Sequence, residues 1–203
     1  LTACLVFAGA VCRQILERRG ITITANAVRV GQATGRELNF DMKRAILDAR
    51  SAGDSVGSEL ECIVTGVPAG VGGLLFGGME SRIAGMLYAI PGVKGVEFGR
   101  GFALAEMRGS EANDPIRLKN GHITMASNNA GGINGGITNG NEIVVRAALK
   151  PTPSIGREQM TYNLATNKVE PLMIRGRHDI CVALRGAVVV EAAVAIALAN
   201  FIR

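Results

Sequence analysis

Apolar residues recur at helical spacing in some parts of the chain and form short runs or alternate with polar residues in others. Helical spacing predicts four helices, at residues 2–19, 40–52 and 79–89 and from Ala187 onward. Strand-like stretches bounded by glycine, proline or polar residues predict five strands, at residues 21–30, 55–67, 93–99, 102–109 and 142–149. Residues 110–120 form a polar connection, and residues 156–176 are expected to be mostly irregular. This order of elements predicts a single α+β domain over residues 1–203.

Four residues mark the ends of the predicted helices. Gly20 stands where a glycine commonly follows a helix, Asn39 introduces the second helix, Gly53 stops it, and Pro91 ends the third. In the strand at 21–30, the apolar side chains indicate a buried face formed by Ile21, Ile23, Val28 and Val30.

The composition limits the kind of core and the kind of partner. Of the 203 residues, 48% are hydrophobic, yet only 4% are aromatic and 27 are glycine. The core must therefore be built from small side chains, which let backbone elements approach closely. The formal net charge of +5 is mild, the basic residues are scattered, and few aromatic rings are available for base stacking. Nucleic-acid binding is not expected.

The cysteines argue against a zinc site and against a disulfide framework. They lie far apart and form no C-x-x-C pair: Cys4, Cys12, Cys62 and Cys181. This usage favours a reducing cytosol, and Cys4 and Cys12 are expected to share the buried face of the first helix. The apolar stretches at the start and at residues 187–202 fall short of the roughly 18 residues of a membrane span. Buried helices are predicted for both.

The stretch SNNAGGINGGITNG, residues 127–140, suits neither a helix nor an ordinary strand. It lacks the spacing of a P-loop or a dinucleotide-binding motif. Two interpretations stay open. The glycines could form a turn where backbones pack tightly, or the backbone with Asn128 and Asn129 could approach a flat ligand with hydrogen-bonding edges.

Two other segments offer anion or proton chemistry. LKPTPSI, residues 149–155, sets Lys150 beside Thr152 and Ser154 on a proline-stiffened backbone. This is either an anion cradle or a proline-containing strand exit. RGRHDICV, residues 175–182, combines arginine, histidine and aspartate, and is either a salt-bridged corner or a site for anion binding and acid–base chemistry.

Five long motifs follow one another along the chain, and together they cover nearly all of residues 40–195. They are GDSVGSELECIVTGVPAGVG, IPGVKGVEFGRGFALAEMRGSEANDP, SNNAGGINGGITNG, RAALKPTPSI and GRHDICVALRGAVVVEA. In sequence and order they resemble the chorismate synthase family. LTACLVFAGAVCRQIL resembles the family's helix that follows an Arg-Ser-Ser-like flavin motif.

The resemblance implies a lyase. Family members convert 5-enolpyruvylshikimate 3-phosphate to chorismate and phosphate by anti-1,4-elimination, the last step of the shikimate pathway. They require reduced FMN, although the reaction has no net redox change. The implied fold is a β-α-β sandwich, incomplete in this chain, and the implied assembly is a cytoplasmic homotetramer without a metal, a membrane or a nucleic-acid partner.

The resemblance also implies roles for individual residues. The flavin contacts would be Pro91, Gly92, Gly135, Lys150, Pro151, Thr152, Pro153, Ser154 and Arg177. Arg177 would lie at flavin and substrate together, and Asp179 would assist proton transfer at the flavin N5. Asn129 would lie near the flavin, and His178 would be structural.

Part of the family's pattern has no counterpart in this sequence. The family's two working histidines, its substrate-binding arginines and its Arg-Ser-Ser-like segment belong to an N-terminal part, and a C-terminal tail follows the last helix. The 203-residue chain alone is therefore expected to turn over little or no substrate. The alternative interpretations are a non-catalytic remnant that binds flavin or phosphate, and a structural core.

Overall fold

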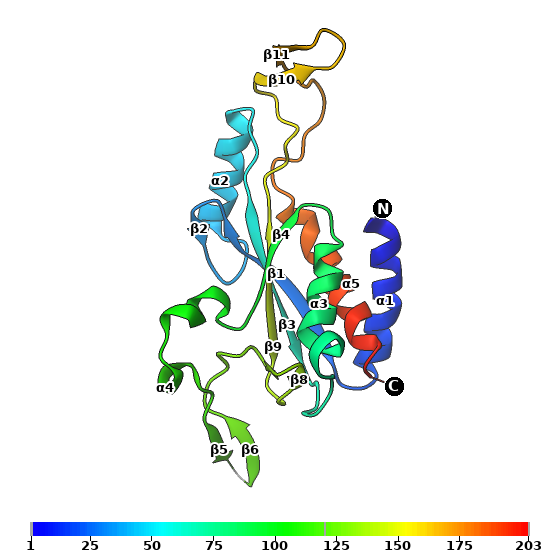
Figure 1. Ribbon diagram of the computed structural model, residues 1–203, viewed down its shortest axis with the longest axis vertical. Helices are drawn as coiled ribbons and strands as arrows, with labels where there is room; N and C mark the ends of the chain where they lie inside the picture. The colour runs from blue at the N-terminus through cyan, green and yellow to red at the C-terminus, as the bar shows by residue number, and fades with distance from the viewer. Residues whose placement is uncertain (1, 120, 203) are drawn as a thin grey trace.

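The computed structural model describes residues 2–119 and 121–202, and its centre is a five-stranded antiparallel sheet (Figure 1). In spatial order the strands are β2 (Ala33–Thr34), β1 (Thr22–Val30), β3 (Ser58–Thr65), β9 (Ile143–Leu149) and β4 (Val93–Phe98). Residues along β3 and β9 alternate between buried and more exposed. One face of the sheet therefore faces the core and the other carries polar side chains.

Three helices cover the apolar face of the sheet (Figure 1). They are α1 (Thr2–Glu17), α3 (Met79–Tyr88) and α5 (Ala183–Ala199), and α5 contacts both other helices as well as β1 and β3. Gly9 of α1 lies so close to Ala192 of α5 that a Cβ at Gly9 would collide with it. The carboxylate of Glu191, inside the apolar α5, contacts Arg13 of α1 at 2.7 Å and accepts the Ala25 N–H at 2.8 Å. These partners explain how a helix this apolar holds a largely buried charge.

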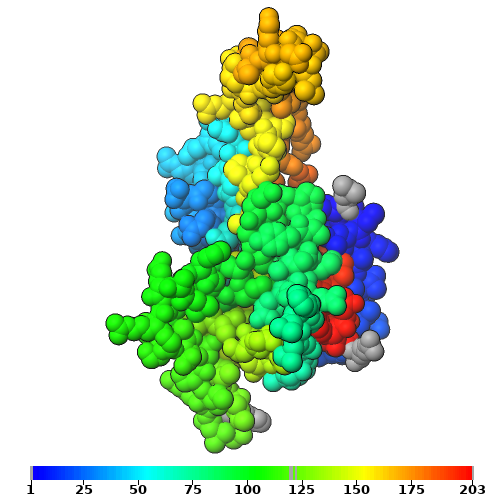
Figure 2. Space-filling model, viewed as in Figure 1, coloured from blue at the N-terminus to red at the C-terminus, as the bar shows by residue number. Residues whose placement is uncertain are grey.

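The remaining elements lie around the sheet. The helix α2 (Phe40–Ser51) begins at Asn39, whose side-chain oxygen accepts the Met42 N–H at 3.0 Å. Two hairpins project from opposite ends of the molecule, as Figures 1 and 2 show. They are β5 (Ile116–Lys119) with β6 (His122–Met125), and β10 (Gln159–Asn163) with β11 (Lys168–Leu172). Short elements complete the chain: η1 (Leu75–Gly77), η2 (Gly101–Glu106), α4 (Gly109–Ala112), β7 (Ile133–Asn134) and β8 (Ile137–Thr138).

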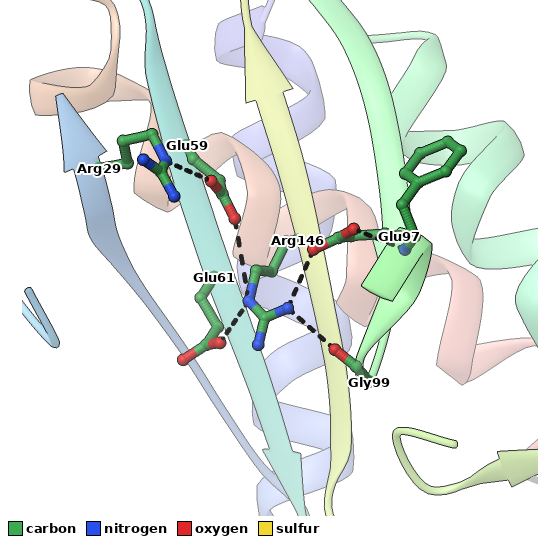
Figure 3. A network of polar contacts seen from close by, with 7 residues as sticks. Arg29, Glu59, Glu61, Glu97, Gly99 and Arg146 are labelled. Atoms are coloured by element: carbon green, nitrogen blue, oxygen red, sulfur yellow. Dashed lines mark hydrogen bonds and ion pairs between the residues drawn. The ribbon is translucent and has the colours of Figure 1, made fainter. Parts of the chain in front are cut away.

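The polar face of the sheet carries an ion-pair network centred on Arg146 of β9 (Figure 3). Its guanidinium lies 2.7 Å from Glu61, 2.9 Å from Glu97 and 3.8 Å from Glu59. It also donates a hydrogen bond to the carbonyl of Gly99 at 2.8 Å. Burial alone would lower the pKa of Arg146, but the hydrogen bonds to Glu97 and Glu61 outweigh it and raise that pKa. The network joins side chains from β3, β9 and β4.

Several predicted elements and their ends are confirmed. Gly20 and Gly53 follow α1 and α2 with φ of 76° and 67°. The α+β class is also confirmed. One face of the five-stranded sheet carries a helix layer, and the described residues contain no second large sheet that would complete the expected sandwich. In β1, Ile23 and Val30 are buried, but a bulge between Ala27 and Arg29 leaves Val28 only half-buried. The prediction of one domain over residues 1–203 stays a prediction.

Two predictions about the chain after β4 are wrong. Residues 102–109 do not form a strand, because Gly99 and Gly101 take φ of 56° and 54° and turn the backbone into η2. Residues 156–176 are more ordered than expected, because they contain the hairpin of β10 and β11. Nearly every residue of that hairpin is exposed, so no alternating burial pattern reveals its strands. The polar connection at residues 110–120 likewise contains α4 and β5.

Two predictions about helices also need correction. The helix α5 begins at Ala183, one turn before Ala187, because Gly186 packs against Leu60 of β3 and is tolerated within the helix. Cys4 is exposed and Cys12 half-buried, so they do not share a buried face. Eight residues advance a helix about 80° past two full turns, which moves one of the pair off the face of the other.

Within residues 2–119 and 121–202, no helix is long and apolar enough to cross a membrane. No cluster of three or more His, Cys, Asp or Glu side chains that could hold a metal ion is found in the same ranges. The four cysteines are free thiols.

Candidate active site

Three segments that are far apart in the sequence meet at one end of the sheet (Figure 1). Pro91 and Gly92 form the turn between α3 and β4, residues 150–154 follow β9, and residues 177–179 precede α5. Because β4 and β9 are neighbouring strands, the backbone N–H of Lys150 donates to the carbonyl of Gly92 at 2.9 Å. The structure thus brings together most of the residues for which the family resemblance implies a flavin contact.

The loop between α2 and β3 holds two of these segments in place. The hydroxyl of Ser55 donates to the carbonyl of Thr152 at 2.6 Å. The backbone N–H of Val56 donates to the carbonyl of Ile180 at 2.9 Å. One loop therefore fixes the segment after β9 and the segment before α5 at the same time.

Two hollows border this end of the sheet, and both are lined by Asp179 and Arg185. The larger, of about 610 Å³, lies between the C-terminal part of α2 and the start of α5 and includes Arg50 and Arg177. The smaller, of about 410 Å³, includes Pro91. Asp179 and Arg185 form an ion pair that lines both hollows. Three arginines around the larger hollow suit a ligand with phosphate or carboxylate groups. Sequence reasoning singled out neither Arg50 nor Arg185.

His178 contacts both neighbouring segments. Its Nδ1 lies 2.8 Å from the Ser154 hydroxyl oxygen, and its Nε2 lies 3.0 Å from the carbonyl oxygen of Ile174. The RGRHDICV segment contains a salt-bridged corner, through Asp179 and Arg185, and it also faces a hollow. The salt-bridged interpretation is confirmed, whereas the interpretation as a site for anion binding and acid–base chemistry stays a prediction.

Gly135 lies at the opposite end of the sheet from the other predicted flavin contacts. It occupies the turn between β7 and β8, near the start of β9, whereas Lys150 follows the end of β9 (Figure 1). The strand has 7 residues, so its ends are separated by about 20 Å. The fold of one chain does not bring Gly135 together with Lys150.

Backbone packing explains much of the glycine in residues 127–140. A Cβ at Gly131 would collide with the backbone of Gly99, and one at Gly136 would collide with the carbonyl oxygen of Gly73. Gly135 differs, because its φ is 58° and no atom lies within 4 Å of its Cβ position. The tight-packing interpretation holds for Gly131 and Gly136, whereas only the backbone conformation requires glycine at 135.

Asn128 and Asn129, the two asparagines considered for ligand binding, use their side chains within the fold. Asn129 donates to the carbonyls of Glu111 and Ala112, each at 3.2 Å. Asn128 donates to the carbonyl of Glu142 at 2.8 Å. Their side-chain donors are therefore engaged without a ligand.

Asp114, which sequence reasoning missed, holds the start of the same stretch. Its Oδ1 accepts the Ser127 hydroxyl at 2.6 Å and the Asn129 N–H at 2.7 Å, and its Oδ2 accepts the Ala130 N–H at 2.9 Å. Partial burial would raise the pKa of Asp114, but the hydrogen bonds from Ser127, Ala130 and Asn129 outweigh it and lower that pKa. The Asn-Asp-Pro sequence at 113–115 signals a turn, but it does not signal these partners.

Comparisons with known proteins agree with the resemblance seen in the motifs. The sequence profile of a family described as chorismate synthase matches residues 1–202. A curated chorismate synthase of Chitinophaga pinensis is 45% identical over 201 residues, which cover 99% of this chain. The chain belongs to the chorismate synthase family. A further relative, the chorismate synthase of Thermococcus kodakarensis, is 42% identical over 98% of this chain.

A solved structure gives the same result for the fold of this family member. A crystal structure of chorismate synthase matches 98% of this chain with a TM-score of 0.80 and 30% sequence identity. The match covers 62% of that chain, and the two relatives named above are covered over 58% and 61% of their lengths. The chain thus spans about three fifths of the length of the chorismate synthases it matches.

Proposed function

We propose that the protein binds reduced FMN and 5-enolpyruvylshikimate 3-phosphate and catalyses the formation of chorismate and inorganic phosphate. The observation that carries this proposal is the meeting of residues 91–92, 150–154 and 177–179 at one end of the sheet. Membership in the chorismate synthase family supports the same reaction.

The residues at this end of the sheet fit a flat ligand that carries a phosphate. The φ of Gly92 is 95° and no atom lies within 4 Å of its Cβ position, so a ring could lie against its backbone. Lys150 is exposed and offers a cation to a phosphate. We assign Pro91, Gly92, residues 150–154 and Arg177 to the flavin.

The reaction removes one proton and the phosphate group from the substrate and forms one new carbon–carbon double bond. When bound, the reduced flavin supplies an electron-rich ring for this elimination, with no net change in its redox state. We assign to Arg177 the binding of anionic groups of substrate and flavin. We assign to Asp179 the role of assisting proton transfer at the flavin N5. Arg185, its ion-pair partner, would hold the Asp179 carboxylate in place.

The position of Gly135 supports an assembly of several copies. Within one chain the length of β9 separates it from Lys150. If both residues contact the same flavin, Gly135 comes from a second copy. A homotetramer, as the family resemblance implies, would provide that copy. The proposal includes a cytoplasmic location, which the free cysteines support.

The proposal is tested by titrating the protein with FMN, with and without substrate, and by assaying chorismate formation under reducing conditions. Lys150→Met is expected to weaken FMN binding by about tenfold or more, because it removes a charged hydrogen-bond donor. The control is Lys168→Met, in the exposed strand β11, with unchanged affinity. In the complete product of the gene, Asp179→Asn is expected to reduce turnover while FMN affinity stays within about twofold.

Three outcomes separate the interpretations. FMN binding with turnover supports the proposal. FMN binding without turnover, by the 203-residue chain and by the complete product of the gene alike, supports a non-catalytic remnant. No FMN binding by either protein supports a structural core and refutes the proposal.

A further inference from the structure

A contact between Ser154 and His178 joins the two segments of the candidate site across the base of the β10–β11 hairpin. The Ser154 hydroxyl oxygen lies 2.8 Å from His178 Nδ1. On the other side of the ring, Nε2 lies 3.0 Å from the carbonyl oxygen of Ile174. Both side chains are half-buried, so the two partners hold the ring in a defined orientation.

For a neutral imidazole, these partners determine where the hydrogen atoms lie. A backbone carbonyl oxygen only accepts hydrogen bonds, so Nε2 of His178 must carry a hydrogen. In a neutral imidazole, Nδ1 then has a lone pair and accepts. The remaining donor in the contact is the hydroxyl of Ser154, and its single hydrogen points at His178. The Ser154 oxygen has only lone pairs left for any other partner.

We propose that His178 is a positioning residue that fixes Ser154 as a hydrogen-bond acceptor toward the ligand. Ser154 then takes an N–H or O–H group of the ligand and does not donate to a phosphate oxygen. This changes the view of residues 149–155 as an anion cradle with two hydroxyl donors, because Ser154 is not one of the donors. The identification of the ligand as a flavin rests on the proposed function. The assignment of Ser154 as a hydrogen-bond acceptor does not depend on it.

Two substitutions at His178 separate its two hydrogen bonds. Asparagine places its side-chain oxygen near the position of Nδ1, so His178→Asn keeps an acceptor for Ser154 and loses the bond to Ile174. Glutamine places its side-chain nitrogen near the position of Nε2, so His178→Gln keeps the bond to Ile174 and loses the acceptor for Ser154. The free Ser154 hydroxyl can then rotate its hydrogen toward the ligand.

FMN titrations of these variants test the role of the contact. His178→Gln and Ser154→Ala are each expected to weaken FMN binding by about three- to tenfold, the effect of one neutral hydrogen bond. The double variant is expected to bind FMN no less tightly than whichever single variant has the lower affinity, because both changes disrupt the same contact. His178→Asn is expected to stay within about twofold of the unsubstituted protein. If His178 were purely structural, the loss of FMN affinity in each variant would instead parallel its loss of thermal stability. His178→Asn and His178→Gln would then bind FMN equally.

Nitrogen-15 NMR of the histidine rings tests the hydrogen positions without a flavin. The protein has 2 histidines, His122 and His178, so the signals are few. The expected spectrum of His178 shows a hydrogen on Nε2 and none on Nδ1. Ser154→Ala is expected to move the Nδ1 resonance and to leave the Nε2 resonance in place.

The outcomes distinguish a failure of this inference from a failure of the proposed function. A hydrogen on Nδ1, or an Nδ1 resonance unchanged in Ser154→Ala, overturns the inference even if FMN binds. Equal FMN affinity for the unsubstituted protein and His178→Gln overturns it as well. If the unsubstituted protein does not bind FMN while the NMR result is as expected, the proposed function fails and the assignment of Ser154 polarity stands.

Discussion

Replacing Asp114 by asparagine tests whether one carboxylate holds the start of the glycine stretch. Two of its three hydrogen bonds, from the Ser127 hydroxyl and the Asn129 N–H, end on Oδ1. The third, from the Ala130 N–H, ends on Oδ2. An asparagine oxygen can keep the first two, but its NH₂ group would then face the Ala130 N–H, so one donor loses its acceptor.

Losing one bond to a charged acceptor, and the charge that strengthens the other two, would cost up to about 3 kcal/mol in a buried site. Asp114 is only half-buried, so water compensates in part, and we expect a loss of about 1–2 kcal/mol in the free energy of unfolding. If the stretch opens locally, the same loss appears as faster hydrogen exchange of the Asn129 and Ala130 amides.

The effect depends on pH in a defined direction. The pKa of Asp114 is lower in the folded protein than the ordinary value of 3.8. The carboxylate therefore contributes its full stability above that ordinary value, and the contribution is lost as the pH falls through the lower folded pKa. The difference in stability between the unsubstituted protein and Asp114→Asn should be largest near neutral pH and should shrink below about pH 4.

The assay is urea unfolding of both proteins across this pH range, with amide exchange at neutral pH. Ser127→Ala is the control, because it removes one donor and leaves both backbone donors, so its loss should be smaller than that of Asp114→Asn. A loss below about 0.3 kcal/mol together with unchanged amide exchange would refute the reasoning, as would a difference that grows on acidification.

Three further predictions concern the packing of the core and its connections. Ser58→Ala should raise the free energy of unfolding by about 1 kcal/mol, since the buried hydroxyl has no partner among the described residues; urea unfolding that shows a clear loss would contradict this. Gly131→Ala should lower the free energy of unfolding by more than about 2 kcal/mol because its Cβ would collide with a backbone, whereas Gly135→Ala should lower it by only about 1 kcal/mol because of its positive φ. Similar shifts of the melting temperature for both variants would be inconsistent with this packing. Burial, with a smaller contribution from the charge of Glu191, raises the pKa of the Cys62 thiol. Iodoacetamide should therefore modify the exposed Cys4 and reach Cys62 only after unfolding, which peptide mass spectrometry would show.

The local signals in the sequence predicted the elements that depend on local physics. The amide of Asn39 caps α2, and Gly53 ends it, because capping and a left-handed backbone need only the neighbouring residues. Strands were also predicted where β3 and β9 lie, and both strands have one face buried against the helix layer. The family's motifs also identified the segments that meet at the end of the sheet.

Elements without a buried face were predicted poorly. The hairpin of β10 and β11 is exposed on both sides, so its strands have no apolar periodicity. Residues 102–109 were predicted to form a strand, but after the turn at Gly99 and Gly101 they pair with no strand among the described residues. A period shows which residues could form an element, and hydrogen-bonding partners decide whether they do.

The sequence by itself determined the family, the α+β class, the ends of the first helices and the segments that carry the candidate chemistry. Only the tertiary structure decided which of those residues share a site. Gly131 and Gly135 are four positions apart and look equivalent in the sequence, yet one is required by a backbone from another segment and the other faces open space. The order of strands puts Lys150 beside Gly92 and a strand's length away from Gly135. Such distances depend on which strands pair, and that pairing is set by contacts between residues far apart in the chain.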